Sequence, residues 1–283
     1  MRYRPYGKSG HVVSAISLLL DGAVRHSVRD WRTLIATAMD HGVNGFEIAG
    51  DAPALIEAVT AAFADMERDL LFIAWRPHGL PAEPGHAIEA LLARTGLGYL
   101  DLINFDDVPP TPEVLERIRM MRWVRSWGLT SDDEDTDLLI ARGAFDCLTT
   151  CYSPVSGWRE RNRLKSAAER GLAVIARNVW PEAMQPKAVL FKKPPLLGRR
   201  KEPLAGIGGY SFLENTPGWT AEEICLAYVL TEPAVTTVRF EVDRIEHLTR
   251  LAEVPDRDLP TGVAAQIEMA RFSDDASRKS ART

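Results

Sequence analysis

Short, nearly continuous apolar runs alternate with amphipathic helical segments along almost the whole chain, and this alternation restricts the fold more than any other feature. The runs "LLFIAW" (70–75) and "YLDLINF" (99–105) resemble parallel strands that are buried on both faces. Further strands are predicted at residues 12–20, 44–48, 124–129, 147–150, 173–176 and 235–239. About eight strand–helix units in roughly 250 residues predict an α/β chain that closes into a (β/α)8 TIM barrel.

The helical segments between these strands carry start and stop signals. Ser27 and Asp30 form a capping-box pattern, and Gly42 ends the helix that follows. Thr220 and Glu223 repeat the capping pattern late in the chain. Other helices are predicted at 53–66, 87–95, 135–142 and 156–170, from Pro112 onward, and around residues 245–251.

The motifs and composition of the chain also indicate its fold type, its number of domains and its long loops. No Gly-rich dinucleotide fingerprint follows the first strand, which counts against a Rossmann fold. No shift in composition marks a second domain, so a single barrel domain is predicted over residues 1–271. The Pro, Gly and Lys/Arg content of residues 180–219 indicates a long, mobile βα loop on the functional face, and residues 272–283 are predicted to be a disordered tail.

Charge and composition exclude several classes of protein. A net charge of −5 and a pI near 5.8 argue against a dedicated nucleic-acid binder. The first residues lack the apolar core of a signal peptide, and no apolar run approaches the ~20 residues that span a bilayer. Three cysteines without zinc-type spacing and scattered histidines predict no metal site, and we expect a cytoplasmic protein with no membrane or nucleic-acid partner.

A family resemblance enters at this point. The opening "MRYRPYGKSGHVVSAISL" resembles the amino-terminal β-hairpin and first strand of aldo-keto reductases, which are NAD(P)H-dependent (β/α)8 enzymes. The segments "GVNGFEIA", "RDLLFIAWRP", "YLDLINF", "VRSWGLTS", "GLAVIARN" and "PAVTTV" match further segments of that family in order, over about residues 1–251. The resemblance therefore implies a barrel preceded by an N-terminal β-hairpin.

The same resemblance points to an altered catalytic set. In the family, a hydride passes from the nicotinamide to the carbonyl carbon while a tyrosine protonates the carbonyl oxygen, with help from an aspartate, a lysine and a histidine. The matching positions here are Glu47 for the aspartate, Ala52 for the tyrosine, Arg76 for the lysine and Asp106 for the histidine. Alanine has no proton to give, so either the charged positions form a salt-bridge cluster over a disused pocket, or a carboxyl such as Asp106 replaces the acid.

The cofactor positions implied by the resemblance are altered less uniformly. Glu241 and Asp243 lie at or near the places that hold the adenosine 2′-phosphate, so NAD(H) is favoured over NADP(H). The resemblance implies seven residues at or near the cofactor: Thr130, Ser131, Thr149, Arg177, Asn178, Arg239 and Arg244.

Three functions remain open at this level. The first is a catalytically inactive aldo-keto reductase homologue that binds NAD(H) and regulates through protein–protein interaction. The chain resembles the KidO-type regulators of alphaproteobacteria, and this implies a division-ring tubulin homologue or a histidine kinase as partner. The alternative is an active NAD(P)H-dependent carbonyl reductase with a rearranged proton donor, and a third reading is a stable scaffold such as a channel β-type subunit.

Overall fold

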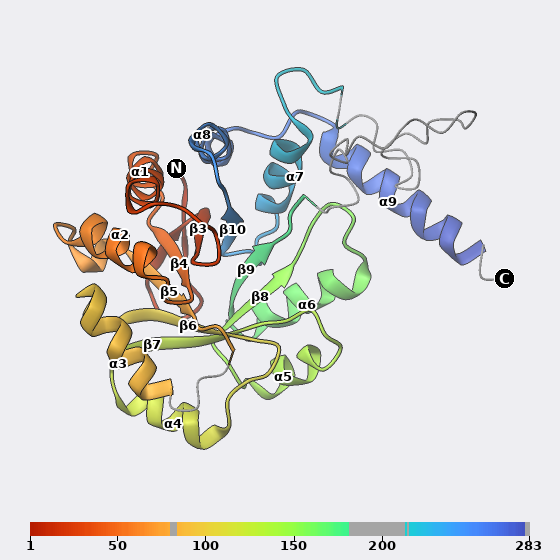
Figure 1. Cartoon of the computed structure of the whole chain (residues 1–283). Coiled ribbons are helices and arrows are strands. Elements are labelled where there is room, and N and C mark those ends of the chain that lie inside the picture. Colours follow the sequence, from red (N-terminus) through yellow and green to blue (C-terminus); the bar gives the residue numbers. More distant parts are fainter. Residues whose placement is uncertain (80–83, 181–212, 214, 281–283) are drawn as a thin grey trace, which may run out of the picture.

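Eight parallel strands close into a barrel in the computed structural model of the chain, which describes residues 1–79, 84–180, 213 and 215–280 (Figure 1). The strands follow one another around the barrel in sequence order, from β3 to β10, and β10 pairs again with β3. This arrangement confirms the predicted (β/α)8 barrel. The barrel strands are β3 (Ile16–Asp21), β4 (Gly45–Ala49), β5 (Phe72–Arg76), β6 (Leu100–Asp106), β7 (Val124–Thr130), β8 (Cys147–Cys151), β9 (Ala173–Arg177) and β10 (Thr237–Glu241).

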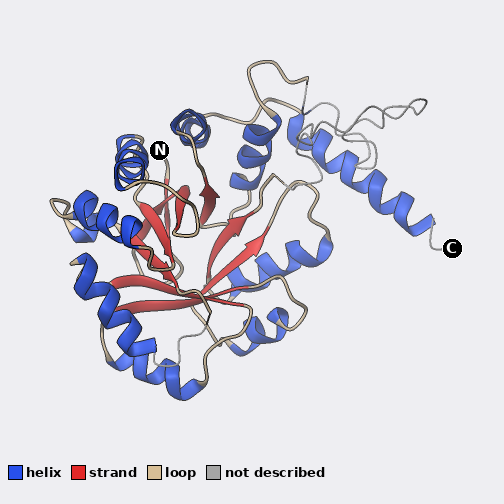
Figure 2. Ribbon diagram, viewed as in Figure 1, coloured by secondary structure: helices blue, strands red, loops and turns tan. Residues whose placement is uncertain are grey.

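Helices cover the outside of the barrel, as Figure 2 shows. Both predicted capping boxes are confirmed, since the side chain of Ser27 accepts from the backbone of Asp30 and that of Thr220 accepts from the backbone of Glu223. The covering helices are α1 (Val28–Asp40), α2 (Pro53–Phe63), α3 (Pro84–Thr95), α4 (Pro112–Met120), α5 (Thr136–Arg142), α6 (Trp158–Glu169), α7 (Ala221–Leu230) and α8 (Ile245–Glu253). Short 3-10 turns occur at η1 (Arg68–Leu70) and η4 (Val254–Asp256).

The expected N-terminal hairpin closes the end of the barrel where the strands begin. Strands β1 (Tyr3–Pro5) and β2 (Val12–Ser14) pair antiparallel in a separate two-stranded sheet. The buried side chains of Tyr6 and Val13 join a cluster formed by inward-facing strand residues, namely Phe72, Ala74, Leu102, Cys147, Ala173 and Ile175. A Cβ atom on Gly45 would lie 2.9 Å from the Val13 side chain, so the hairpin can seat there only against a glycine.

Side-chain alternation divides each strand between two environments. Residues such as Ile48, Ile73 and Trp127 face the helices and belong to the large apolar cluster between barrel and helices. Their neighbours in sequence face the barrel interior, where the composition changes from apolar near the hairpin to polar near the carboxyl ends of the strands. The polar end is where barrel enzymes place their sites.

The chain ends in a helix that the sequence analysis did not predict. Helix α9 (Val263–Ser280) follows α8 and projects away from the barrel (Figure 1). Its Glu268 accepts from Arg161 of α6 at 2.9 Å and also from Tyr228 of α7, which fixes the first half of the helix to the barrel. The helix continues to Ser280, and the predicted disorder of residues 272–283 stays a prediction.

Two expectations remain predictions. The predicted mobile loop at 180–219 falls mainly on residues outside the described part of the chain. The single-domain boundary at residue 271 also stays a prediction. Among the described helices, none combines the length and the apolar character that crossing a bilayer requires.

Candidate functional site at the carboxyl ends of the barrel strands

A buried carboxylate occupies the centre of the polar half of the barrel interior. Glu47, on the inward face of β4, is only 3% exposed. Its Oε1 atom accepts a hydrogen bond of 2.5 Å from Arg239 of β10 and lies 3.2 Å from Nε of Arg76, at the end of β5. Two guanidinium groups thus share one carboxylate, which compensates the cost of burying its charge.

Asn104 of β6 connects this carboxylate to the opposite wall. Its Nδ2 atom lies 3.4 Å from Oε2 of Glu47 and donates to the Thr149 hydroxyl of β8 at 2.9 Å. Asn104 is fully buried, and the sequence analysis missed it. The signal was present, since an amide within the mainly apolar strand "YLDLINF" is unusual unless it has partners.

Three of the four family-related positions, Glu47, Arg76 and Asp106, are joined by ion pairs, but they differ in exposure. Asp106, at the end of β6, lies 3.7 Å from Arg76 and its side chain is 43% exposed, so it faces the opening rather than the interior. Ala52 is the N-cap residue of α2 and makes no side-chain capping bond. The predicted cluster of Glu47, Arg76 and Asp106 is therefore present, and Arg239 joins it.

A second polar cluster lies beside the first, at the ends of β7, β8 and β9. Asp132 forms an ion pair with Arg177 and accepts from the Thr150 hydroxyl and the Cys151 backbone, both at 2.7 Å. Burial acts to raise the pKa of Asp132, but the hydrogen bonds from Cys151 and Thr150 and the charge of Arg177 outweigh it, so the pKa is lowered. Asp132 was also missed by the sequence analysis.

The cysteine beside this cluster is not a nucleophile. Burial, together with its contact with Asp132, raises the pKa of Cys151 to about 11, so the thiol stays protonated at neutral pH. Asn178, which has a positive φ of 52°, places its amide 3.3 Å from the Cys151 sulfur. This pair belongs to the wall of the site.

Several buried polar atoms near the mouth have no hydrogen-bond partner within the described residues. They include the Thr130 hydroxyl, the Oδ1 atom of Asn104 and the Nε atom of Arg177. Leaving such a group unpaired costs about 1–3 kcal/mol, so each is a place where a further group would gain by binding. The neighbouring Ser131 hydroxyl is already used, because it accepts from Thr136 at 3.0 Å and from the Asp133 backbone at 3.2 Å.

Several solved structures share the architecture of this chain. The chain resembles aldo-keto reductase AKR11C1 from Bacillus halodurans in its holo form, with a TM-score of 0.75 and 18% identity over 95% of this chain and 96% of that one. The apo form of that protein gives a TM-score of 0.74 at 17% identity, with coverage of 95% and 96%. PA4992 from Pseudomonas aeruginosa gives 0.64 at 15% identity, with 94% of each chain covered.

The fold is that of an aldo-keto reductase. At identities below one fifth, the likeness concerns the fold alone. No protein-family model matches the sequence, and neither does any curated protein.

Within this aldo-keto reductase fold, the predicted cofactor residues separate into three groups. Thr149 and Arg239 belong to the interior cluster around Glu47. Arg177 and Asn178 lie at the second cluster, and Thr130 and Ser131 end and follow β7. Arg244, the N-cap residue of α8, is 76% exposed and lies 3.7 Å from Asp243, so the described contacts join it to neither cluster.

No metal centre was predicted, and the described residues offer no arrangement that would hold one. Among them, His, Cys, Asp and Glu side chains form no group of three or more that could ligate an ion.

Proposed function

We propose that this protein is an aldo-keto-reductase-fold barrel that binds NAD(H) without reducing carbonyl compounds and acts by binding another protein. The observation that carries the proposal is the state of the Glu47 carboxylate. It is buried between Arg76 and Arg239, and the family's proton-donor position is Ala52.

Protonating a nascent alkoxide requires an acid within hydrogen-bond reach of it. The Glu47 carboxylate accepts hydrogen bonds from Arg239 and Asn104 and forms an ion pair with Arg76, so its oxygens are engaged as acceptors and it is a poor source of a proton. Guanidinium groups do not release a proton at physiological pH, so neither Arg76 nor Arg239 can serve as the acid. Asp106 is solvent-exposed and lies 3.7 Å from Arg76 at the opening, outside the buried interior where Glu47 lies.

Polar groups near the carboxyl ends of the barrel strands support nicotinamide binding. The unpaired Thr130 hydroxyl and the Asn104 carbonyl oxygen offer a donor and an acceptor that a carboxamide group could satisfy, and Arg177 presents a planar guanidinium beside them. When bound, a reduced nicotinamide supplies a hydride. The residues of this chain would bind and orient the ring.

The segment after β10 favours NAD(H) over NADP(H). Arg239 is directed into the barrel and bonded to Glu47, so it is not available to a 2′-phosphate. Arg244 is the remaining cation at the predicted positions, and it faces Asp243. Glu241 is exposed at the end of β10. Two acids beside one arginine disfavour a further phosphate.

The protein partner is proposed on the resemblance to KidO-type regulators alone. That resemblance favours a division-ring tubulin homologue or a histidine kinase. A cytoplasmic location is proposed as well, on the cysteine content and the polar first residues of the sequence. The structure adds a candidate surface for a partner, which is described in the next subsection.

Calorimetric titration of the full chain with NADH and NADPH tests the cofactor. We expect NADH to bind in the micromolar to millimolar range and NADPH to bind at least about tenfold more weakly. Arg177→Ala should weaken NADH binding, whereas Arg170→Ala, at an exposed position at the end of α6, should not. Absence of binding by either nucleotide would remove the cofactor from the proposal.

A turnover assay separates this function from the alternative reductase. With NADH and a panel of aldehydes, we expect no sustained oxidation of NADH, and Ala52→Tyr alone should not create efficient turnover because lysine is absent from position 76. Steady turnover that Asp106→Asn abolishes and Asp258→Asn does not would establish the reductase with Asp106 as its acid. Asp258 serves as the control because it is an exposed acid paired with an arginine, Arg2, as Asp106 is paired with Arg76.

A further inference from the structure

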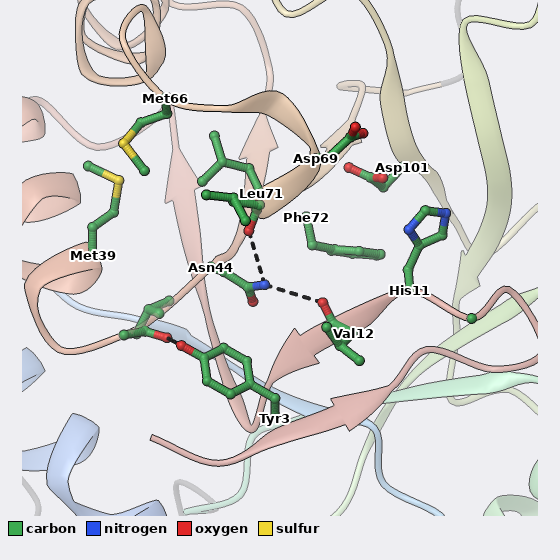
Figure 3. A pocket seen from close by; sticks show the side chains of 14 residues that line it. Tyr3, His11, Val12, Met39, Asn44, Met66, Asp69, Leu71, Phe72 and Asp101 are labelled. Carbon is green, nitrogen blue, oxygen red and sulfur yellow. Dashed lines mark hydrogen bonds between the residues drawn. The ribbon is translucent and has the colours of Figure 1, made fainter.

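A groove lies at the other end of the barrel, where the strands begin and the hairpin closes the interior. It has a volume of about 520 Å³ and lies between the hairpin, the end of α1 and the turn η1. Figure 3 shows Met39 and Met66 on one side of it, with His11 and Asp69 on the opposite side. Its size falls within the range of ligand-binding clefts.

Exposed apolar side chains are concentrated in this groove. Tyr3 is 51% exposed, Val12 56%, Met66 38% and Leu70 57%, and all four line it. The other large apolar side chains that are exposed in the described part of the chain are dispersed over other elements: Val108, Met120, Leu138, Trp158, Ile245 and Met269. A contiguous exposed apolar patch typically marks an interaction site.

The frame of the groove is fixed by hydrogen bonds among its own residues. Asn44 donates to the carbonyl oxygens of Val12 and Leu70, both at 3.2 Å, and the Tyr3 hydroxyl donates to the Gly42 carbonyl at 2.9 Å (Figure 3). Phe72 lies at the back and stacks on Tyr6 at 4.5 Å between ring centroids. A partner would therefore meet a preformed surface, which lowers the entropic cost of binding.

One polar wall of the groove is internally neutralised. Asp101 accepts from Arg68 at 2.8 Å, from Arg125 at 3.2 Å and from the Ile73 backbone at 2.8 Å. Arg125 also lies 3.3 Å from Asp69 and from the ring of His11. These groups satisfy one another and leave little charge unpaired at this wall.

Exposed acidic residues adjoin the two lining methionines in the chain, and we call them the acidic rim of the groove. Asp40 follows Met39 in the chain, and Asp65 and Glu67 flank Met66; all three are exposed, and no ion pair joins them to another described residue. Asp69 is tied to Tyr99 at 2.6 Å, and the bond from Tyr99 lowers the pKa of its carboxyl. Cationic groups thus complement this rim, and anionic ones are repelled.

We propose that this groove, formed by Tyr3, Val12, Met39, Met66 and Leu70, docks a short segment of a partner protein that presents apolar side chains flanked by Lys or Arg. The inference deepens the proposed role in protein binding and rests on it, but it uses a surface separate from the barrel mouth. Cofactor and partner would bind at opposite ends of the barrel without competing.

Charge argues against the other occupants of an apolar groove. Anionic lipid surfaces and nucleic acids would meet the acidic rim with like charge. A second copy related by a two-fold axis would place the same acidic rim against itself. Adaptable methionines beside preformed aromatic and aliphatic side chains suit a segment of another protein.

Two labelled synthetic peptides of about 12 residues, with the same apolar residues and either Lys or Glu at the flanks, test the groove by fluorescence anisotropy. With the full chain, we expect the Lys peptide to bind at least about tenfold more tightly than the Glu peptide. Leu70→Ser should weaken the Lys peptide by about tenfold, whereas Leu138→Ser should leave its affinity unchanged. The two leucines are matched in exposure, at 57% and 58%.

Met66→Ser provides a second variant should Leu70→Ser unfold the chain, with circular dichroism as the check on folding. Equal affinity for both peptides, or an equal effect of Leu70→Ser and Leu138→Ser, overturns the proposal. Sedimentation that shows a dimer of the native chain lost in Leu70→Ser would assign the groove to a second copy and also overturn it. NADH binding should be unchanged in Leu70→Ser, so failure of the groove and failure of the cofactor site give different results.

Discussion

The two halves of the barrel interior solve the same packing problem in opposite ways. Near the hairpin, the interior is filled by apolar side chains and by the ring of Tyr6. Near the mouth, it is filled by Glu47, Arg239, Arg76 and Asn104, with an unpaired hydroxyl close by. Apolar burial stabilises a fold directly, whereas a buried ion pair rarely exceeds an apolar replacement in stability. The charges at the mouth are therefore poorly explained by stability alone.

This contrast fits a barrel whose frame is maintained apart from reductive chemistry. The apolar half, the hairpin and both capping boxes are intact, while the mouth keeps a charged cluster but has alanine at the proton-donor position. A mouth whose ionic groups satisfy one another is suited to holding a bound group in one orientation. It is poorly suited to cycling a proton.

Neutralising the shared carboxylate should have the largest effect. Glu47→Gln leaves Arg239, which is 8% exposed, and Arg76 without their common counter-charge, and we expect a loss of about 3–5 kcal/mol in the free energy of unfolding. Urea unfolding followed by circular dichroism measures it. The paired replacement Glu47→Leu with Arg239→Leu removes both charges and should recover much of that loss.

An unchanged urea midpoint in Glu47→Gln would mean that water reaches the cluster and screens it. The upper half of the interior would then be an open cavity, and the contrast with the lower half would be one of hydration rather than of packing.

Truncating the apolar half should cost slightly less. Leu102→Ala removes a fully buried side chain beside the hairpin, and we expect a loss of about 2–5 kcal/mol from lost burial and the cavity that remains. Leu138→Ala is the control, since that leucine is 58% exposed on α5 and its truncation should change stability by less than about 0.5 kcal/mol. Similar losses in both variants would contradict the assignment of Leu102 to the core.

Most of the fold could be predicted from the sequence because its determinants are local. The apolar run at 70–75 and the capping residues Ser27 and Asp30 depend on period and on neighbours within one helical turn. Helix α9 was missed because its stability comes from Arg161 and Tyr228, which lie 107 and 40 residues away from Glu268 in the chain. Long-range contacts of that kind leave no local signal.

The sequence predicted several residues of the site, but it did not predict which of them contact one another. The family-related positions of Glu47, Arg76 and Asp106 were identified by sequence order, but the bond from Arg239 to Glu47 joins strands 192 residues apart in the chain. Arg239 was expected near the phosphate of the cofactor. That hypothesis required its side chain to point out of the barrel, whereas it points inward and bonds to Glu47. Asn104 and Asp132 were missed because neither stands at a position that the resemblance singles out.

Overpacking the boundary between the two halves should have an intermediate effect. A Cβ atom on Gly128 would lie 2.8 Å from the Cys147 carbonyl oxygen and 3.1 Å from Oδ1 of Asn104. We expect Gly128→Ala to cost about 1–3 kcal/mol, measured by urea unfolding, because backbone must move to admit the methyl group. Gly157→Ala, where the added atom meets only the flexible end of Glu160, should cost less than about 1 kcal/mol. Equal costs in Gly128→Ala and Gly157→Ala would show that the backbone around Gly128 moves easily to admit a methyl group.

The smallest effect should come from the mouth of the barrel around Asp132, where solvent screens the charges. Asp132 has a lowered pKa in the folded chain, so its ionised form contributes stability that is complete above its unfolded pKa, near 3.8, and is lost as the pH falls through the folded value. Since its side chain is 37% exposed, the contribution should be below about 1 kcal/mol. Urea midpoints of the native chain and of Asp132→Asn should therefore differ at pH 6 and converge as the pH falls below about 4. A difference that stays constant down to pH 3 would mean that Asp132 stabilises the mouth through hydrogen bonds that asparagine also makes, and that its charge contributes nothing.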